Sequence, residues 1–194
     1  ASHSGTTPMN MRKDALLGAS EIALELEKVA IHEQEHGTVA TVGVLDIHSG
    51  AMNVVPGEVL MKIDIRSSSV QSRKFVLDHL LKTIENVEKN RMLDIESNMI
   101  SSEEPVLLSP ELIDGLQDIC VKKDLPFQVM QSGAGHDAMN MTRLAPVGLI
   151  FVPSEDGLSH HPDEFTDLDD ILIGIDVLEE AVLHYAKAGI SVSN

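Results

Sequence analysis

Histidines in short turns are the residues of this chain that are best suited to chemistry. His136 lies in residues 132–137, Ser-Gly-Ala-Gly-His-Asp, and His160 lies in residues 157–165, Gly-Leu-Ser-His-His-Pro-Asp-Glu-Phe. His3 opens a third such turn, His-Ser-Gly-Thr-Thr-Pro-Met. Glycine, serine and proline fix these turns, so the backbone can aim an imidazole into a cleft. An imidazole placed in this way can bind a metal, transfer a proton or stabilise an anion.

Two further segments carry side chains that suit the binding of a small polar substrate. Asn53 stands in a turn ahead of a proline-glycine pair, and its amide offers both a donor and an acceptor. Arg66 ends an alternating run that begins at Glu58, and its guanidinium can bind a carboxylate through two parallel hydrogen bonds. Each residue also has a purely structural interpretation, Asn53 as a turn residue and Arg66 as an exposed strand residue paired with Asp64 or Glu58.

Taken in order, these five segments resemble the metal-dependent amidohydrolases that include N-carbamoyl-L-amino-acid hydrolase, β-ureidopropionase and allantoate amidohydrolase. Those enzymes are relatives of the aminoacylase and glutamate-carboxypeptidase metallopeptidases. The resemblance extends from residue 3 to residue 165. It implies hydrolysis of a non-peptide C–N bond in a carbamoyl or ureido compound, with two divalent metal ions, zinc or manganese, that polarise the carbonyl and supply hydroxide.

The resemblance also implies a role for each candidate residue. In the family, the lid domain of one subunit reaches over the metal site of its dimer partner. The lid histidine stabilises the oxyanion, and the asparagine and arginine hold the carboxylate and ureido groups of the substrate. In this sequence the matching positions are His3 for catalysis, Asn53, Arg66, Gly135 and His136 for substrate binding, and His160 for metal binding. We expect Asp137 to set the tautomer of His136.

Members of that family are about twice as long as this chain, with most metal ligands in their N-terminal half. We therefore expect this chain to be a C-terminal portion that binds metal at most weakly by itself, because zinc normally needs three or four protein ligands. Two alternatives remain open: a dimerisation and ligand-binding module without catalysis, and an aminoacylase or dipeptidase specificity. We also expect a homodimer or larger species built through residues 1–104.

Secondary-structure patterns place these residues on two predicted domains. Residues 1–104 are expected to form a ferredoxin-like βαββαβ lid with a truncated first strand. Its predicted elements are a helix at 12–35, strands at 38–47 and 58–66, a helix at 70–90 capped by Ser69, and a strand at 93–100. The polar segment 101–105 ends in a proline and marks the boundary.

Residues 105–194 are expected to form the C-terminal segment of a split α/β catalytic domain. Ser109 followed by proline predicts the start of a helix, and the segments 127–130 and 147–152 read as short buried strands. A final helix follows residue 166. Its predicted inward stripe consists of Leu168, Ile171, Leu172, Ile175, Leu178, Val182 and Tyr185.

Composition excludes several classes of function. The formal net charge of −17 opposes binding to nucleic acid, and the absence of tryptophan leaves few stacking platforms for bases. The sequence has no apolar run long enough for a membrane span. The single cysteine, Cys120, is in phase with a helical apolar stripe, which predicts a reduced thiol and a cytoplasmic location.

One metal-binding motif is set aside. Residues 32–36 match the zincin pattern H-E-x-x-H, but they lie in the last turn of a predicted helix, just before Gly37. Glu33, and not the two histidines, falls nearest the apolar stripe of that helix. We expect a solvated helix end whose histidines complement the helix dipole.

Overall fold

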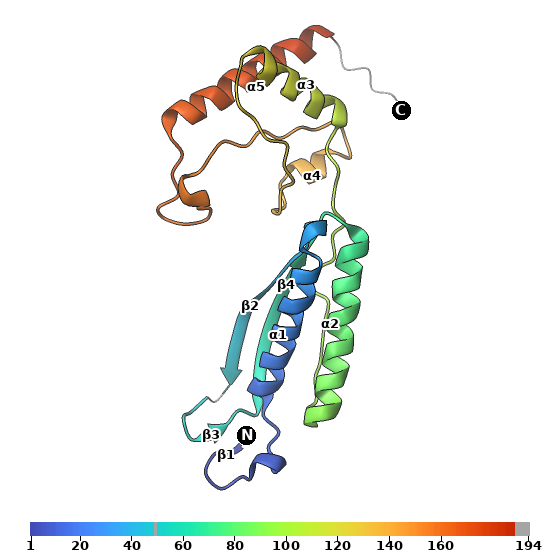
Figure 1. Cartoon of the computed structure of the whole chain (residues 1–194), viewed down its shortest axis with the longest axis vertical. Coiled ribbons are helices and arrows are strands. Elements are labelled where there is room, and N and C mark those ends of the chain that lie inside the picture. Colours follow the sequence, from blue (N-terminus) through green and yellow to red (C-terminus); the bar gives the residue numbers. More distant parts are fainter. Residues whose placement is uncertain (49, 189–194) are drawn as a thin grey trace. The chain divides into compact units, whose positions relative to one another are not determined.

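The computed structural model describes residues 1–48 and 50–188. The chain divides into two compact units, Ala1–Pro105 and Val106–Asn194 (Figure 1). The mixed α/β fold class predicted from the sequence is confirmed. The assignment of the first unit to a lid and of the second to a catalytic domain stays a prediction. None of the helices in the described part of the chain is long and apolar enough to cross a membrane.

The first unit packs two long helices against a two-stranded antiparallel sheet (Figure 1). Its elements are β1 Ser2–His3, η1 Met9–Met11, α1 Ala15–His32, η2 Gln34–His36, β2 Val39–His48, β3 Val54–Val55, β4 Glu58–Arg66 and α2 Val70–Arg91. The ladder between β2 and β4 runs from Val39↔Arg66 to His48↔Glu58, with an irregularity between Val42 and Val44. A second small sheet pairs β1 with β3.

The core of this unit follows from two periodicities. Alternate strand residues point to one face of the sheet, and helix residues three and four apart form one stripe. The buried helix residues are Ile22, Leu26 and Val29 of α1 and Val76, Leu80 and Val87 of α2. They pack against Ala40, Val42, Met61, Ile63 and Ile65 of the sheet. As predicted, Ser69 caps α2, because its hydroxyl accepts a hydrogen bond from the Ser72 N–H at 3.2 Å.

The strand predicted at residues 93–100 was wrong, because no strand is assigned there. Leu93 and Ile95 pack against the core as their alternation suggests. Their N–H groups, however, donate to Glu88 of α2, that of Leu93 to the backbone carbonyl at 3.0 Å and that of Ile95 to the side chain at 3.2 Å. Donors used in this way cannot form a ladder with β4, so the segment lies along the core as irregular backbone.

The second unit is built on two helices. Its described elements are α3 Pro110–Lys122, α4 Ala138–Met141, η3 Glu155–Gly157 and α5 Leu168–Ala188. Ser109 caps α3 through a hydrogen bond from the Leu112 N–H, as predicted. Ile119 of α3 packs against Val177 and Ala181 of α5, and the half-buried thiol of Cys120 adjoins this cluster.

Two predictions for the second unit were wrong. The segments 127–130 and 147–152 are irregular backbone rather than strands. In α5, the buried positions are Val177 and Ala181, while the apolar residues of the predicted inward stripe are 38–65% exposed, namely Leu168, Ile171, Leu172, Ile175, Leu178 and Val182. Apolar residues surround much of this helix, so its sequence period does not identify the face that α3 covers.

Gly115 allows α3 and α5 to approach closely. A Cβ at this position would lie 1.9 Å from the Tyr185 hydroxyl oxygen and 3.0 Å from Cζ. That hydroxyl donates to the Glu111 carbonyl at 3.0 Å, and burial raises the pKa of the Tyr185 phenol above its ordinary value. Tyr185 is therefore protonated at neutral pH and acts as a hydrogen-bond donor between the two helices.

We expect Gly115→Ala to destabilise the protein by about 1–2 kcal/mol, because overpacking costs up to ~3 kcal/mol and the gain in helix propensity returns only ~1 kcal/mol. Urea unfolding measures the change in the free energy of unfolding. Gly133→Ala is the matched control, since a Cβ there would meet no atom within 4 Å. Equal unfolding midpoints for the two variants would contradict the close approach.

Candidate functional site

The turn that holds His3 fixes the direction of its imidazole. The Gly5 N–H donates to His3 Nδ1 at 3.0 Å, and the Thr7 N–H donates to the His3 carbonyl at 3.1 Å. Because Nδ1 accepts a hydrogen bond, the neutral imidazole carries its proton on Nε2. The exposed ring of His3 therefore presents Nε2 as a hydrogen-bond donor.

Arg12 holds the same turn from the other side. Its Nε donates to the Thr7 carbonyl at 3.0 Å, and its Nη2 donates to the Ser4 carbonyl. A guanidinium is a rigid fork of donors, so it keeps two carbonyls at a set separation. Asp14 caps α1 just beyond, because its side chain accepts from the Leu17 N–H. No motif in the sequence predicted this role of Arg12.

Asn53 lies beside the His3 turn, so the structure brings these two candidates together. The Ser4 N–H donates to the Asn53 carbonyl at 2.9 Å, and His3 pairs with Val54 across β1 and β3. Gly57 permits the close approach of β1, because a Cβ there would lie 2.1 Å from the Ala1 nitrogen. Close packing against Ala1 therefore requires a glycine at this position of the turn that follows Asn53.

Arg66 lies at the other end of the first unit. It is the last residue of β4 and pairs with Val39, whereas β1 and β3 lie where β4 begins (Figure 1). The eight steps of β4 span about 27 Å at ~3.4 Å per residue. Arg66 Nε donates to Asp64 Oδ2 at 2.7 Å, the pairing expected of a structural arginine. Within one molecule, Arg66 does not join His3 and Asn53.

His136 has a different partner from the one expected. Its Nε2 lies 2.8 Å from the hydroxyl of Ser132, and its ring lies 5.5 Å from that of Phe151. Asp137 instead precedes α4, and its backbone carbonyl accepts from the Asn140 N–H at 3.0 Å. The hydrogen-bond partner of the His136 ring among the described residues is thus Ser132, and the prediction that Asp137 sets the tautomer of His136 was wrong. Ser132 is four residues upstream in the same turn, a spacing that sequence reasoning could have used.

Gly135 adjoins this ring, and its flexibility is not demanded by packing. A Cβ there would make only an ordinary contact with Met139, at 3.7 Å from the sulfur. The position is exposed beside the half-buried His136. A glycine that packing does not require is consistent with close approach of a ligand to the backbone.

His160 stands in a strained turn. Its φ of 57° lies in the left-handed region, which costs a residue other than glycine about 1–3 kcal/mol. The turn is held by Glu164, whose Oε2 accepts from the His160 N–H at 2.8 Å. His161 is engaged separately, since its Nδ1 accepts from the Asp163 N–H at 3.2 Å. Backbone strain of this kind concentrates at functional positions and marks His160 as a candidate.

His160 fits the role of one metal ligand, because it is an exposed imidazole on a fixed turn. Among residues 1–48 and 50–188, no group of three or more His, Cys, Asp or Glu side chains could hold a metal ion. The role of His160 as a metal ligand stays a prediction.

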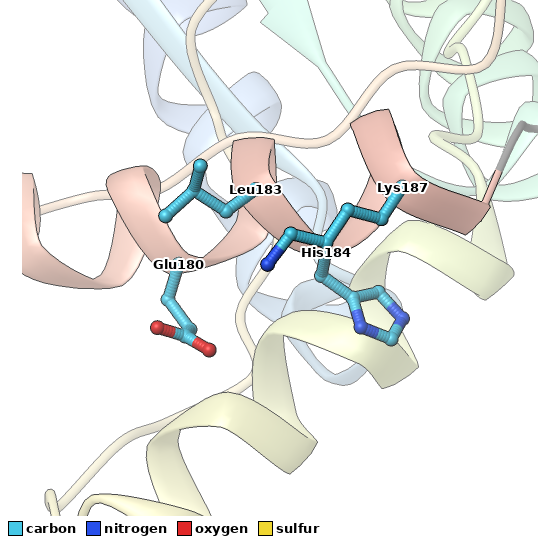
Figure 2. A pocket seen from close by; sticks show the side chains of 4 residues that line it. All are labelled: Glu180, Leu183, His184 and Lys187. Atoms are coloured by element: carbon cyan, nitrogen blue, oxygen red, sulfur yellow. The ribbon is translucent and has the colours of Figure 1, made fainter.

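Two of the surface hollows among the described residues lie in the second unit. One has a volume of about 420 Å³ and is lined by side chains of α5, namely Glu180, Leu183, His184 and Lys187 (Figure 2). The other has a volume of about 170 Å³ and is lined by Ile119, Lys122, Lys123 and Glu180. Neither hollow contains a candidate site residue. The candidate residues therefore lie outside both hollows.

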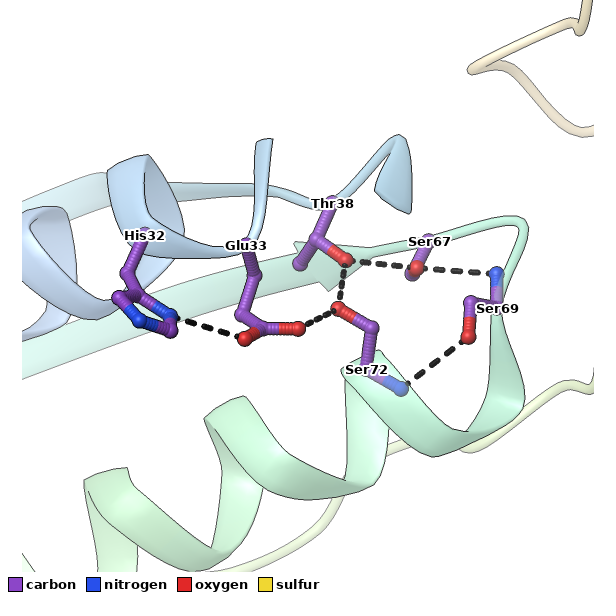
Figure 3. Close-up of polar contacts among 6 residues, drawn as sticks. All are labelled: His32, Glu33, Thr38, Ser67, Ser69 and Ser72. Carbon is purple, nitrogen blue, oxygen red and sulfur yellow. Dashed lines mark hydrogen bonds and ion pairs between the residues drawn. The ribbon is translucent and has the colours of Figure 1, made fainter. Parts of the chain in front are cut away.

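The zincin-like segment has its glutamate inside and its histidines outside. Glu33 is buried, whereas His32 and His36 are exposed. Figure 3 shows the Glu33 carboxylate between the His32 ring and the Ser72 hydroxyl. Glu33 Oε2 accepts a hydrogen bond from the Ser72 hydroxyl at 2.6 Å. That bond is the main reason why the pKa of Glu33 lies below its ordinary value. Burial of the carboxylate raises the pKa of Glu33 and so opposes this effect, whereas His32 and His36 lower it further. The predicted solvated helix end is thus correct for the histidines, and Glu33 is buried, as its place nearest the apolar stripe predicted.

The lowered pKa of Glu33 predicts an acid-dependent stability. A carboxyl whose pKa is lowered in the folded state stabilises the fold above its ordinary pKa of 4.5, and this contribution is lost as the pH falls through the lowered pKa. We expect Glu33→Gln to be less stable than the wild type at pH 7 and to lose less stability on acidification. Urea unfolding at a series of pH values from 7 down through the lowered pKa measures the free energy of unfolding of each variant. Glu35→Gln, on the exposed surface, is the control. Parallel pH profiles for Glu33→Gln and the wild type would contradict the prediction.

Solved structures define the class to which this fold belongs. An amidase of the hydantoinase/carbamoylase family from Burkholderia multivorans superposes with a TM-score of 0.90 at 30% identity, covering 94% of this chain and 44% of that chain. The model of peptidase family M20/M25/M40 matches residues 10–184. The chain belongs to this family, and the membership predicted from the sequence motifs is confirmed.

Curated relatives agree with this assignment. A hydrolase of Haemophilus influenzae is 44% identical over 187 residues, covering 96% of this chain and 45% of the relative. An N-carbamoyl-L-amino-acid amidohydrolase of a Pseudomonas strain is 36% identical, with 95% and 45% covered. The allantoate amidohydrolase of Escherichia coli is 32% identical, with 92% and 43% covered. The chain spans less than half the length of these relatives.

Proposed function

We propose that this chain is part of an amidohydrolase that cleaves a non-peptide C–N bond in a carbamoyl or ureido compound. The observation that carries the proposal is its similarity, over more than nine-tenths of its length, to proteins named N-carbamoyl-L-amino-acid amidohydrolase and allantoate amidohydrolase. The proposed site residues are His3, Asn53, Arg66, Gly135, His136 and His160.

His3 has the geometry needed for an electrostatic role in this reaction. Attack on a carbamoyl carbon places negative charge on the former carbonyl oxygen, and a donor already aimed at that oxygen stabilises it. The Gly5 N–H occupies Nδ1, so His3 offers Nε2–H. The neighbouring Asn53 side chain can donate to one polar group of the substrate and accept from another.

Two divalent metal ions, zinc or manganese, would polarise the carbonyl and supply hydroxide in the proposed reaction. His160 would hold one of them through its imidazole, on the turn that Glu164 fixes. The remaining ligands would come from residues beyond those that the structure describes. His136, oriented by Ser132, would contact the substrate at the edge of this centre.

The separation of Arg66 from His3 supports a site shared between two subunits. The roughly 27 Å length of β4 exceeds the span of a carbamoyl amino acid, so one molecule cannot place both residues on one substrate. In a two-fold dimer, each site could receive His3 and Asn53 from one subunit and Arg66 from the other. Arg66 would then bind the substrate carboxylate with its guanidinium fork.

Two features of the first unit support dimerisation through this region. Leu17, Leu24 and Ile31 are exposed and lie seven residues apart, so they form one apolar stripe along the outside of α1. Helix α1 packs against β2, whose hydrogen-bonded neighbour in the described sheet is β4. The other edge of β2 and the α1 stripe can each pair with their own copies across a two-fold axis.

Substrate preference tests the proposal. We expect the enzyme that contains this chain, supplied with zinc or manganese, to hydrolyse N-carbamoyl amino acids or allantoate with a kcat/KM at least about 100-fold above that for N-acetyl amino acids. A site that hydrogen-bonds a substrate N–H rejects analogues that lack it. Equal turnover of N-acetyl amino acids would instead indicate an aminoacylase, and binding without turnover would indicate a non-catalytic module.

A further inference from the structure

Four chain segments converge where β4 ends. Glu33 follows α1, Thr38 precedes β2, Ser67 follows β4 and Ser72 lies in the first turn of α2 (Figure 3). Thr38 is 2% exposed, and Ser72 and Glu33 are buried nearly as deeply. The core that joins the helices to the sheet is made of other residues, so these polar groups serve some purpose besides filling space.

These side chains form one continuous series of short hydrogen bonds. The Ser72 hydroxyl donates to Glu33 Oε2 at 2.6 Å, and Thr38 Oγ1 lies 2.6 Å from the Ser72 oxygen and 2.7 Å from the Ser67 oxygen. The Ser69 N–H donates to the same Ser67 oxygen at 3.0 Å. If one of these bonds breaks, buried polar groups lose their hydrogen-bond partners at a large cost in free energy. The network therefore resists opening and stiffens this part of the structure.

The network brackets the residue pair that carries Arg66. Val39 and Arg66 are the last pair of the ladder between β2 and β4. Thr38 precedes Val39 and Ser67 follows Arg66. The side-chain hydrogen bond between Thr38 and Ser67 therefore links the two chains one residue beyond the last backbone pair of the ladder. Terminal strand pairs fray when nothing follows them, because their opening exposes few contacts. Here a side-chain bond replaces the missing ladder bond.

We propose that Glu33, Ser72 and Thr38 are positioning residues that hold the end of β4 and thereby fix the place from which Arg66 reaches a substrate. The substrate part rests on the proposed function, in which Arg66 binds a carboxylate. Positional errors of about 1 Å at a binding group reduce catalysis severely, which gives a physical reason for a rigid support at this strand end. Apolar packing alone would set distance but not direction, since only hydrogen bonds are directional.

The test removes the central hydroxyl without changing shape. Thr38→Val keeps the branched side chain and lacks the oxygen, whereas Thr38→Ser keeps the oxygen. Ser20→Ala is the matched control, because its hydroxyl makes a local bond to the Leu16 carbonyl in α1, away from the network. Amide hydrogen exchange of the full chain is measured residue by residue, together with the NMR signal of Arg66 Nε–H.

We expect Thr38→Val to speed exchange at residues 66 and 67 by about 10-fold and to leave residues 61–63 unchanged, while Thr38→Ser and Ser20→Ala resemble the wild type. An equal increase in exchange along the whole of β4 would overturn the proposal, since the network would then stabilise the whole fold rather than the end of the strand. No increase at all would also overturn it, since the network would then not stabilise the strand end.

A second measurement separates the positioning role from the proposed function. An N-carbamoyl amino acid is titrated into the full chain while the Arg66 Nε–H signal is followed. We expect Thr38→Val to weaken the apparent Kd by about 5-fold, because the guanidinium fork of Arg66 is then less well placed to bind the carboxylate. A wild-type signal that the ligand does not move would refute the carboxylate role of Arg66, and the exchange data would still decide whether the network holds this strand end.

Discussion

In the proposed amidohydrolase, replacement of His3 by alanine is expected to lower kcat by about 10²–10³-fold, with little change in KM, because removal of one oxyanion donor typically has this effect. The donor acts on charge that develops during the reaction, so the transition state loses more than the bound substrate does. The tautomer imposed by the Gly5 N–H is the structural basis for this expectation. Steady-state kinetics with an N-carbamoyl amino acid give both parameters.

Two further variants test whether the turn, and not only the imidazole, matters. His48→Ala is the control, because His48 is a surface histidine of the same unit whose Nδ1 lies 3.0 Å from Glu58 Oε1. The kcat of Gly5→Ala should lie between those of His48→Ala and His3→Ala. The new Cβ would lie 3.2 Å from His3 Cε1 and displace the imidazole ring. If KM rises while kcat is retained in His3→Ala, the residue binds substrate and does not stabilise an oxyanion.

Two inactive variants should restore activity when they are combined. His3→Ala and His160→Ala would each disable both sites of a dimer. In a mixed dimer, one of the two sites would receive an intact His3 from one subunit and an intact His160 from the other. Random reassociation should therefore recover about a quarter of the wild-type activity, since half of the dimers are mixed and each has one working site.

The recovery is measured after the two purified variants are mixed and allowed to exchange subunits. Leu24→Glu introduced into both variants is the control, because a charge on the apolar stripe of α1 should prevent dimerisation and abolish recovery. Light scattering should then report monomers. Absence of recovery between variants that do exchange subunits would show that His3 and His160 serve one site within one subunit.

Local signals in the sequence were sufficient to predict α1, α2, α3 and α5 and the strands of one of the two strand pairs, but not the short helix α4. The three-to-four spacing of α1 and α2 and the alternation along β4 predicted both the elements and their buried faces. Ser69 and Ser109 capped the helices that they were expected to cap, because a cap depends on residues within one turn. Family membership followed from motifs that are equally local.

The sequence did not predict which segments contact each other in the folded chain. Residues 93–100 alternate like a strand, but their first donors bond to Glu88. The apolar residues of α5 fill more than one face, and the position of α3 selected Val177 and Ala181. Ser132, and not the neighbouring Asp137, is the hydrogen-bond partner of the His136 ring. Each outcome depends on which other segment is nearest, a property that no periodicity records.

The sequence by itself determined the family, the candidate residues and the types of the regular elements, because each is set by residue identities within a few positions of one another. The tertiary structure decided the grouping of those candidates. It joined His3 to Asn53 through the pairing of β1 with β3, and it placed Arg66 at the far end of β4. It also joined Glu33 at the end of α1 to Ser72 of α2 through a hydrogen bond. Such groupings come from contacts between segments distant in sequence, whose geometry is fixed only when the core and its hydrogen bonds form together.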